Sequence, residues 1–419
     1  MEVSEGLFWC CAVCTLATAS YQWMWEQKKG WLAGFWAAAL LALQGQLYMW
    51  GFHGFFGVLA MCCAHYFILE RNDFLSMCGK PVLITGCDTG FGHALAKELS
   101  GRGVWVFAGV LDRNGSGAQE LMKLGSRRIK VLQLDVTDPD QVAQAHRDIC
   151  DAQVGEAGLW GLVNNAGILG CVVDAEIQPL ANFRRCMEVN FLSVVNLCQV
   201  FLPLLRRSKG RIVNVTSLGG EVPIPFFSAY GASKAALGCF SRVLRLELAD
   251  WGVKVVVVQP AGFKTSIFKG CEDSKQEIVK NLPSAIYKEY GDAYICSLQD
   301  CLAKVSQQSP EDLQPVVNDM CHALLSASPK PLYTPGQMAR LLPFLYHLCP
   351  TAVSDKLLTS HKFVDCKPAG LRPKVASNCL LVSASRPLCM NWTTPMLDEG
   401  GNSLKSHNRP AAKQPAQHG

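Results

Sequence analysis

A tyrosine and a lysine four residues apart carry the most specific chemistry in the sequence. Tyr230 and Lys234 would share one face of a helix, because residues four apart are neighbours on a helix surface. An unperturbed tyrosine titrates at about pH 10, and a nearby ammonium group favours its phenolate. A phenol tuned in this way can act as a general base toward an alcohol. The pair therefore predicts alcohol oxidation, although its spacing alone is common enough to occur by chance.

A turn with three glycines lies between a short apolar strand, predicted at 82–85, and an amphipathic helix, predicted at 93–102. Glycines at such a turn let the backbone approach a pyrophosphate at the helix N-terminus, where free N–H groups and the helix dipole favour anions. A glycine triplet alone is a weak signal, but this strand-turn-helix context favours a dinucleotide site. The turn residues expected to contact the dinucleotide are Gly86, Asp88, Thr89, Gly90, Phe91 and Gly92.

An acidic residue follows the second predicted strand. Asp112 lies 20 residues beyond Gly92, just past the strand predicted at 104–108. A carboxylate at this place accepts hydrogen bonds from a ribose 2′-hydroxyl and repels a 2′-phosphate. Arg113 beside it would weaken that preference, and Asp88 in the glycine turn would strengthen it. These residues favour NAD over NADP, with a solvated loop carboxylate as the alternative.

A parallel sheet is needed to bring these residues together. After Arg71, short β-branched runs alternate with amphipathic stretches. Continuous apolar strands of this kind are covered by helices on both faces. The pattern predicts an α/β fold with a doubly wound Rossmann sheet, in a domain spanning residues 78–350. The predicted strands are 82–85, 104–108, 129–134, 159–163, 211–215 and 253–258.

The chain of 419 residues is poor in charge, and the shortage lies at its N-terminus. It is 49% hydrophobic and 17% charged, against a usual charged share of about 25%. No charged residue occurs in 6–25 or in 30–69, and one membrane span needs roughly 20 apolar residues. Residues 1–72 are therefore expected to form a membrane anchor of two or three transmembrane helices. A cleaved signal peptide or a buried core helix explains the second, longer run less well.

The charges around these runs bear on topology. The positive-inside rule places Lys28 and Lys29 on the cytosolic side. Three spans then leave the domain in the cytosol, and two place it in the lumen. Asn214 is a glycosylation sequon inside a predicted strand, where a glycan conflicts with the fold, so we expect a cytosolic domain on the endoplasmic reticulum membrane. Residues 373–419 are rich in Ser, Pro, Asn and Lys without periodicity, which predicts a disordered tail.

Composition also excludes several classes of function. The 20 cysteines are scattered over the whole chain, which favours reduced thiols over the disulfide scaffold of a short secreted protein. No CxxC pair repeats at zinc-ligand spacing, so no metal site is expected. The net charge is only +5, and no basic run with interleaved aromatic residues suggests nucleic acid as a partner.

Five motifs together resemble the short-chain dehydrogenase/reductase family. In the family's order, they are the glycine turn 85–92, Asp135, the segment 164–167, Asn190, and Ser217 with Tyr230 and Lys234. The resemblance covers about 80–268. It implies a Rossmann sheet and hydride transfer between a nicotinamide and a secondary alcohol or ketone. One departure is Ala261, which stands where the family usually has a glycine, shortly before Thr265.

The resemblance also implies a role for each residue. Tyr230 would be the acid/base, and Lys234 would lower its pKa and hold the nicotinamide ribose. Ser217 would orient the reacting oxygen, so Ser217 and Tyr230 would contact the substrate. Asn190 would support a proton-relay water and complete the catalytic set. The cofactor contacts implied beyond the glycine turn and Asp112 are Asp135, Asn164, Ala166, Gly167, Tyr230, Lys234 and Thr265.

Within the family, the sequence is similar to the steroid and retinol branch. About eighty residues precede the first strand, as in the type 2 hydroxysteroid dehydrogenases. Segments 106–111 and 333–336 favour NAD-dependent oxidation of a 17β-hydroxyl, as from estradiol to estrone or testosterone to androstenedione. Segment 221–225 is nearer to the enzymes that oxidise an 11β-hydroxyl, as from cortisol to cortisone. The sequence also leaves open a retinol dehydrogenase and, in a different class of protein, a non-catalytic lipid-binding protein.

The loop after the last predicted strand is expected to cover the substrate, because ligands bind at the carboxyl ends of parallel strands. This lid spans about 263–308 and contains apolar side chains that suit a sterol, although an ordinary amphipathic helix has the same composition. The apolar stretch 341–348 either lies on a bilayer surface or packs as a core helix. The expected partners are a steroid and a lipid bilayer, and the sequence leaves homodimer formation open.

Overall fold

The computed structural model describes residues 74–75, 80–124, 128–154, 157–271, 278–280, 282–360, 364 and 366–372. The expected membrane anchor and the expected C-terminal tail lie outside the described residues. Among those described, one helical stretch, Leu180–Ser208, is long and apolar enough to cross a membrane. Side chains from much of that stretch pack in the core beneath the sheet.

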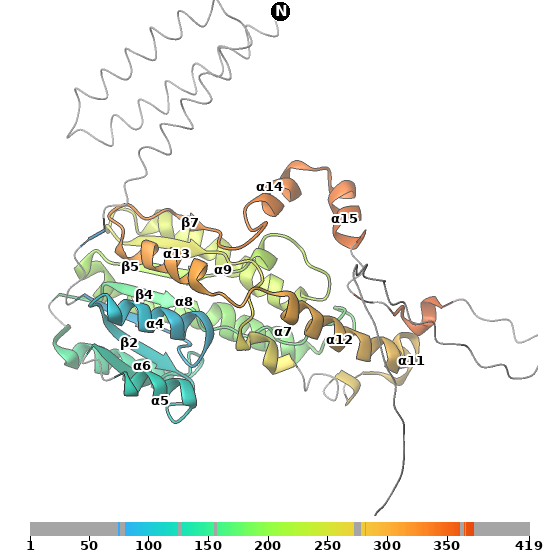
Figure 1. The fold of residues 1–419 in the computed structure, drawn as a ribbon, viewed down its shortest axis with the longest axis horizontal. Helices are drawn as coiled ribbons and strands as arrows, with labels where there is room; N and C mark the ends of the chain where they lie inside the picture. The colour runs from blue at the N-terminus through green and yellow to red at the C-terminus, as the bar shows by residue number, and fades with distance from the viewer. Residues whose placement is uncertain are drawn as a thin grey trace, which may run out of the picture. The chain divides into compact units, whose positions relative to one another are not determined.

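Seven parallel strands form one sheet in the order β3-β2-β1-β4-β5-β6-β7 (Figure 1). The expected doubly wound α/β sheet is confirmed, and each of the six predicted strands is present within a few residues of its expected bounds. The seventh, β7, has two residues, too few for any periodicity to appear. The strands are β1 (Pro81–Ile84), β2 (Trp105–Val110), β3 (Ile129–Gln133), β4 (Gly161–Asn164), β5 (Arg211–Val215), β6 (Lys254–Val258) and β7 (Leu332–Tyr333).

Helices cover both faces of the sheet, because successive strand side chains point to opposite faces. Val82 and Ile84 of β1 join the core formed with α4, α5 and α13, whereas Leu83 packs with α6, α8 and α9. In the described part of the chain, the α-helices are α4 (Gly90–Gly101), α5 (Ser116–Lys123), α6 (Pro139–Ile149), α7 (Leu180–Met187), α8 (Ser193–Ser208), α9 (Ser228–Glu247), α11 (Ser284–Tyr290), α12 (Asp292–Gln308), α13 (Gln314–Leu325), α14 (Leu341–Leu348) and α15 (Thr351–Ser360).

The strand order determines where a ligand can bind. The chain winds outward from β1 in both directions, so β1 and β4 are neighbours where the winding reverses. Ligands of such sheets bind at the carboxyl ends of the strands beside this switch point. The glycine turn follows β1 and the 164–167 segment follows β4, so the fold brings these two motifs together.

The compact unit extends further toward the C-terminus than the expected boundary at residue 350. It includes α15 and a short 3-10 helix, η6 (Ala369–Leu371), and reaches Arg372. In Figure 1, α14 and α15 lie at the upper side of the view, while α5 lies at the lower side. Residues 351–372 are therefore part of the same unit as the sheet.

Candidate active site

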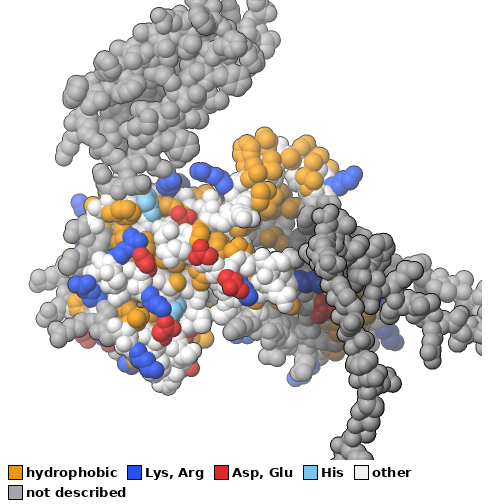
Figure 2. All heavy atoms as spheres, in the orientation of Figure 1, with side chains coloured by type: hydrophobic (Ala, Val, Ile, Leu, Met, Phe, Trp, Pro, Cys, Tyr) orange, Lys and Arg blue, Asp and Glu red, His pale blue; other side chains and the backbone are white. Residues whose placement is uncertain are grey.

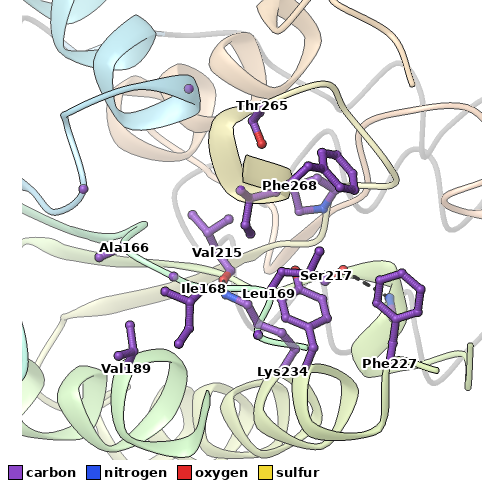
Figure 3. Close-up of a pocket in the computed structure, with 18 of the residues that line it drawn as sticks. Ala166, Ile168, Leu169, Val189, Val215, Ser217, Phe227, Lys234, Thr265 and Phe268 are labelled. Atoms are coloured by element: carbon purple, nitrogen blue, oxygen red, sulfur yellow. Dashed lines mark hydrogen bonds between the residues drawn. The ribbon is translucent and has the colours of Figure 1, made fainter. Parts of the chain in front are cut away.

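A cavity of about 1370 Å³ opens at the carboxyl ends of the strands. In Figure 3, Lys234 points up from α9 toward this cavity, and Thr265 and Phe268 approach it from the opposite side. Most of the predicted site residues line it, and three others (Gly92, Asn164 and Asn190) do not. The predicted residues in its wall are Gly86, Asp88, Thr89, Gly90, Phe91, Asp112, Asp135, Ala166, Gly167, Ser217, Tyr230, Lys234 and Thr265.

The glycine turn is packed against the chain that follows β4. A Cβ on Gly92 would lie 2.5 Å from the Gly86 carbonyl oxygen and 2.6 Å from Asn165 Nδ2. Asn165 Nδ2 donates hydrogen bonds to the carbonyl oxygens of Thr85 (2.9 Å) and Gly86 (3.1 Å). Gly86 itself has φ +69°, which favours glycine. This close-packed turn, with glycines at its points of closest backbone approach, lies at the start of α4 and fits the pyrophosphate of a dinucleotide.

Gly92→Ala is expected to weaken dinucleotide binding by about tenfold or more, because it displaces backbone groups of the turn. A loss of about 1.4 kcal/mol in binding free energy corresponds to a tenfold loss of affinity. The added methyl group must push the Gly86 carbonyl or the Asn165 amide out of place. Calorimetric titration of the full chain with the dinucleotide measures the change. Gly238→Ala in α9 is the matched control, because a Cβ there meets nothing within 4 Å. Equal affinities for both variants and the wild type would contradict this role of Gly92.

The two acidic residues of the ribose end have different tasks. The Asp88 carboxylate accepts hydrogen bonds from the backbone N–H groups of Leu111 (2.9 Å) and Asp112 (3.1 Å), so it positions the end of β2. Asp112 is exposed, and its Oδ1 accepts a hydrogen bond from the Asn114 N–H (2.9 Å). Arg113 does not line the described cavity. The Asp112 carboxylate is therefore the acidic group that a ribose would meet.

Asp135 lines the cavity in the loop after β3. Its Oδ1 accepts hydrogen bonds from the backbone N–H (2.9 Å) and the hydroxyl (2.7 Å) of Thr137. Its own N–H donates to Gln141 Oε1 at 2.8 Å. These bonds hold the loop 134–137 in the cavity wall. The loop follows β3, the edge strand on the opposite side of β1 from β5 and β6.

Asn164, which was expected to contact the cofactor, does not line the cavity. Asn164 pairs in register with Asn214 of β5, and its Nδ2 donates to Asn214 Oδ1 at 2.8 Å. Asn214 in turn donates to Ser241 of α9 at 2.8 Å. Because neighbouring strand residues face opposite sides, Asn164 is buried under the sheet and the next residue, Asn165, lines the cavity.

Tyr230 and Lys234 lie in the first turns of α9, with Ser217 across the cavity at the N-cap of a 3-10 helix, η4 (Leu218–Gly220). Ser217 Oγ accepts a hydrogen bond from the Gly219 N–H at 3.2 Å and lies close enough to the Tyr230 hydroxyl to lower its pKa. Lys234 Nζ is 5.9 Å from the centre of the Tyr230 ring and donates to the Val215 carbonyl oxygen at 2.9 Å. The predicted juxtaposition of the three side chains is therefore present.

Burial dominates the titration of this group. It raises the pKa of Tyr230, and the hydrogen bond from Ser217 acts in the opposite direction. It also lowers the pKa of Lys234 from 10.5 to about 8. The pKa of Tyr230 is therefore shifted upward, opposite to the lowering expected from Lys234, because burial removes hydration from the phenolate.

Asn190 lies behind the cavity wall, in a π-helical turn, η3 (Glu188–Leu192), between α7 and α8. Its side chain is fully buried. Its Oδ1 accepts from the Ile168 N–H (2.8 Å), and its Nδ2 donates to the Ile168 carbonyl (2.9 Å) and to Ser233 Oγ (2.9 Å). Ser233 donates to the Tyr230 carbonyl oxygen at 2.7 Å. Asn190 therefore positions both the 167–168 backbone and the turn that carries Tyr230.

The far end of the cavity is largely apolar. The expected lid supplies Phe263, Ile267, Phe268 and Val305, whereas Leu282 and Tyr287 pack in a separate cluster beneath it. Three contributions here do not follow from the sequence. The Thr89 and Ser266 hydroxyls hydrogen-bond and join the glycine turn to the lid, and Leu342 and Leu358 reach the cavity from α14 and α15. The apolarity of 341–348 could have indicated Leu342, but no pattern in the sequence indicates Leu358.

Comparisons with known proteins agree with this geometry. The family model described as short chain dehydrogenase matches residues 80–276. The chain is 43% identical over 311 residues to estradiol 17-beta-dehydrogenase 2 of Mus musculus. This match covers 73% of this chain and 81% of the mouse protein. It is 42% identical over 308 residues to 11-beta-hydroxysteroid dehydrogenase type 2 of Oryctolagus cuniculus, covering 73% of this chain and 76% of that one.

A solved structure shows the same fold. A short chain dehydrogenase from Burkholderia cenocepacia, in complex with NADP, is 25% identical and superposes with a TM-score of 0.51, covering 68% of this chain and 99% of that one. The region that the family model matches, 80–276, holds the glycine turn and the Ser217, Tyr230 and Lys234 group of this chain. The chain belongs to the short-chain dehydrogenase/reductase family and is an oxidoreductase that acts on CH–OH groups with a nicotinamide cofactor.

Proposed function

We propose that this protein oxidises a steroid hydroxyl to the ketone with NAD, most specifically the 17β-hydroxyl. The observation that carries the proposal is the meeting of Ser217, Tyr230 and Lys234 in the wall of one cavity that also has many apolar side chains. An apolar wall with few polar groups suits a ligand that is hydrophobic except for its reacting hydroxyl. The similarity to estradiol 17-beta-dehydrogenase 2 supports the choice of substrate.

The residues support a stepwise account of the proton. The substrate hydroxyl binds between Ser217 Oγ and Tyr230 Oη, and its proton passes to the Tyr230 phenolate as the carbonyl forms. Lys234, held by the Val215 carbonyl oxygen, supplies positive charge beside that phenolate. A nicotinamide held at the glycine turn and beside Lys234 would supply the acceptor for the hydride that leaves the carbinol carbon. Asn190 keeps the Tyr230 turn and the Ile168 backbone in place during the reaction.

We infer NAD rather than NADP from the exposed Asp112 carboxylate at the end of β2. The wild type is expected to use NAD with the higher kcat/KM. Asp112→Ala is expected to narrow this preference by about tenfold, equivalent to about 1.4 kcal/mol, mainly by improving NADP. Steady-state rates with each cofactor measure it, with Asp250→Ala, an exposed aspartate after α9, as control. A wild type that prefers NADP would refute the proposed role of Asp112.

The 11β-hydroxyl is the second candidate position, because the rabbit 11-beta-hydroxysteroid dehydrogenase type 2 is nearly as similar as the mouse 17β enzyme. A panel of estradiol, testosterone, cortisol and retinol, each with NAD, separates the candidate substrates. The proposal expects the highest kcat/KM for the two 17β-hydroxysteroids. A clear preference for cortisol would move the site of oxidation to position 11, and a preference for retinol would refute a steroid substrate.

We further propose that residues 1–72 anchor the enzyme in the endoplasmic reticulum membrane with the catalytic domain in the cytosol. The charge-free runs 6–25 and 30–69 support this proposal. Protease treatment of sealed microsomes tests the orientation. Degradation of the catalytic domain without detergent is expected, and full protection would place the domain in the lumen.

A further inference from the structure

Helices α14 and α15 carry an exposed apolar surface, which we call the α14–α15 face. Figure 2 shows it as a patch of hydrophobic side chains at the upper edge of the molecule. Phe344 is 61% exposed, Leu348 68% and Leu357 61%. A soluble helix normally keeps one polar side, but α14 has the sequence LLPFLYHL with His347 as its one ionisable group besides a tyrosine. The α14–α15 face comprises Phe344, Leu345, Leu348, Val353 and Leu357.

The opposite side of the same two helices belongs to the substrate end of the cavity. Leu342 of α14 and Leu358 of α15 line it. His347 Nε2 lies 3.4 Å from Glu221 Oε1, and the other Glu221 oxygen accepts a hydrogen bond from Gln259 Nε2 at 2.7 Å. This contact ties α14 to the segment after Ser217 and to the end of β6. The two helices thus separate the cavity from whatever covers their outer face.

The start of the described chain places this side of the domain close to the expected membrane anchor. Phe74 forms an antiparallel bridge with Ser326, and the Leu75 N–H donates to the Leu325 carbonyl oxygen at 2.8 Å. Ser326 leads into β7, which precedes α14. The charge-free run ends at Leu69, and five residues reach at most about 17 Å. An anchor that ends at Leu69 therefore holds the β7 side of the domain near the bilayer.

The charged groups around the α14–α15 face also suit a lipid surface. Arg340 stands directly before α14, and Lys356 is exposed on α15 beside one acidic residue, Asp355. Basic residues at the rim of an apolar face attract anionic head groups. The α14 part of the face, from Phe344 to Leu348, contains no acidic residue, and Asp355 is the one acidic residue of α15. A bilayer therefore matches both the apolar centre and the basic rim.

We infer that the α14–α15 face rests in the head-group region of the bilayer and that these helices admit a lipophilic alcohol from the membrane into the cavity. This inference rests on the proposed anchor and steroid oxidation, and it deepens both. It assigns to α14 and α15 a contact with lipid that is separate from the expected membrane anchor. A second copy of the chain and the chain's own terminal segments are the competing occupants.

Depth-dependent quenching tests the inference without any substrate. The full chain is placed in vesicles of phosphatidylcholine with phosphatidylserine, and an environment-sensitive fluorescent amino acid replaces Leu348. The control carries the same probe in place of Met122, an exposed apolar residue on α5, which lies on the other side of the molecule (Figure 1). Lipids brominated near the head group are expected to quench about half of the emission at position 348, because interfacial helices enter the bilayer by about 5 to 10 Å, and little at position 122.

Equal and weak quenching at both positions would overturn the inference. Energy transfer between copies labelled at position 348 would also overturn it, if the transfer persists when the vesicles are so dilute in protein that most hold one chain or none. That result would identify a second copy of the chain as the occupant of the face. A double variant, Phe344→Glu with Leu348→Glu, is expected to raise KM for the membrane-dissolved alcohol severalfold with kcat unchanged, while Met122→Glu changes neither. Quenching with no turnover of any steroid would uphold the lipid contact and refute the proposed function alone.

Discussion

Tyr230→Phe is expected to lower kcat for alcohol oxidation by about 10²- to 10⁴-fold, the usual contribution of a positioned general base. The variant removes the Tyr230 hydroxyl, whose pKa the neighbouring Ser217 lowers, from the cavity wall. The ring stays in place, so the packing of α9 should be retained. Initial rates of reduced-nicotinamide formation under saturating cofactor measure the change.

Two controls isolate the role of the hydroxyl. Tyr290→Phe removes a tyrosine hydroxyl that bonds Glu176 (2.9 Å) outside the cavity wall, and its kcat should stay within a factor of about two. Cofactor affinity of Tyr230→Phe should change little, since the hydroxyl is proposed to act on the substrate. Wild-type kcat in Tyr230→Phe would show that another group takes the proton.

Lys234→Met is expected to lower kcat by about 10²-fold or more, a loss typical of removing one electrostatic stabiliser from an active site. The variant takes away the positive charge 5.9 Å from the Tyr230 ring and the contact with the Val215 carbonyl. Lys254→Met is the matched control. Its amine also has a lowered pKa and also donates to a backbone carbonyl, that of Ala327 at 2.7 Å, but the residue is exposed and lies outside the cavity wall. Wild-type activity in Lys234→Met would contradict the assignment.

The same substitution should make the protein more stable. Burial lowers the pKa of Lys234 from 10.5 to about 8, which corresponds to roughly 3 kcal/mol, more than the about 1 kcal/mol of its hydrogen bond. Below pH 8 the ammonium is charged in both folded and unfolded chains, so the folded state bears the full burial cost. That cost fades as pH rises from about 8 toward the ordinary lysine value. Lys234→Met should therefore raise Tm most below pH 8, and thermal scans across pH check the sign.

The sheet could be predicted from sequence because its signals are local. Strands buried on both faces are mostly apolar runs, as β1 (PVLI) and β6 (KVVVV) show. The glycine turn could also be predicted, because its three glycines lie between a predicted strand and a predicted helix. The structure shows the need for glycine at position 92, where a Cβ would meet the Gly86 carbonyl oxygen. By contrast, β7 consists of two residues, and its position is set by pairing with β6. No local pattern reports that pairing.

The site could be predicted less completely, because which face a residue occupies depends on the neighbouring strand. Asn164 and Asn165 look alike in sequence, but pairing with Asn214 turns Asn164 into the core and leaves Asn165 in the cavity wall. The role of Ser233 could not be predicted although it lies between Tyr230 and Lys234. Its hydroxyl accepts a hydrogen bond from the buried Asn190 side chain, and this contact depends on tertiary packing. Leu342 and Leu358 reach the cavity only through the tertiary placement of α14 and α15.

Transfer of a labelled hydride tests the central claim most directly. Estradiol deuterated at carbon 17 and cortisol deuterated at carbon 11 are each oxidised with NAD by the full chain, and the reduced cofactor is analysed by mass spectrometry. We predict one deuterium in the reduced cofactor for each ketone formed from estradiol, and loss of this transfer in Tyr230→Phe. Ketone formation without deuterium in the cofactor, or no oxidation of either steroid, would contradict the claim.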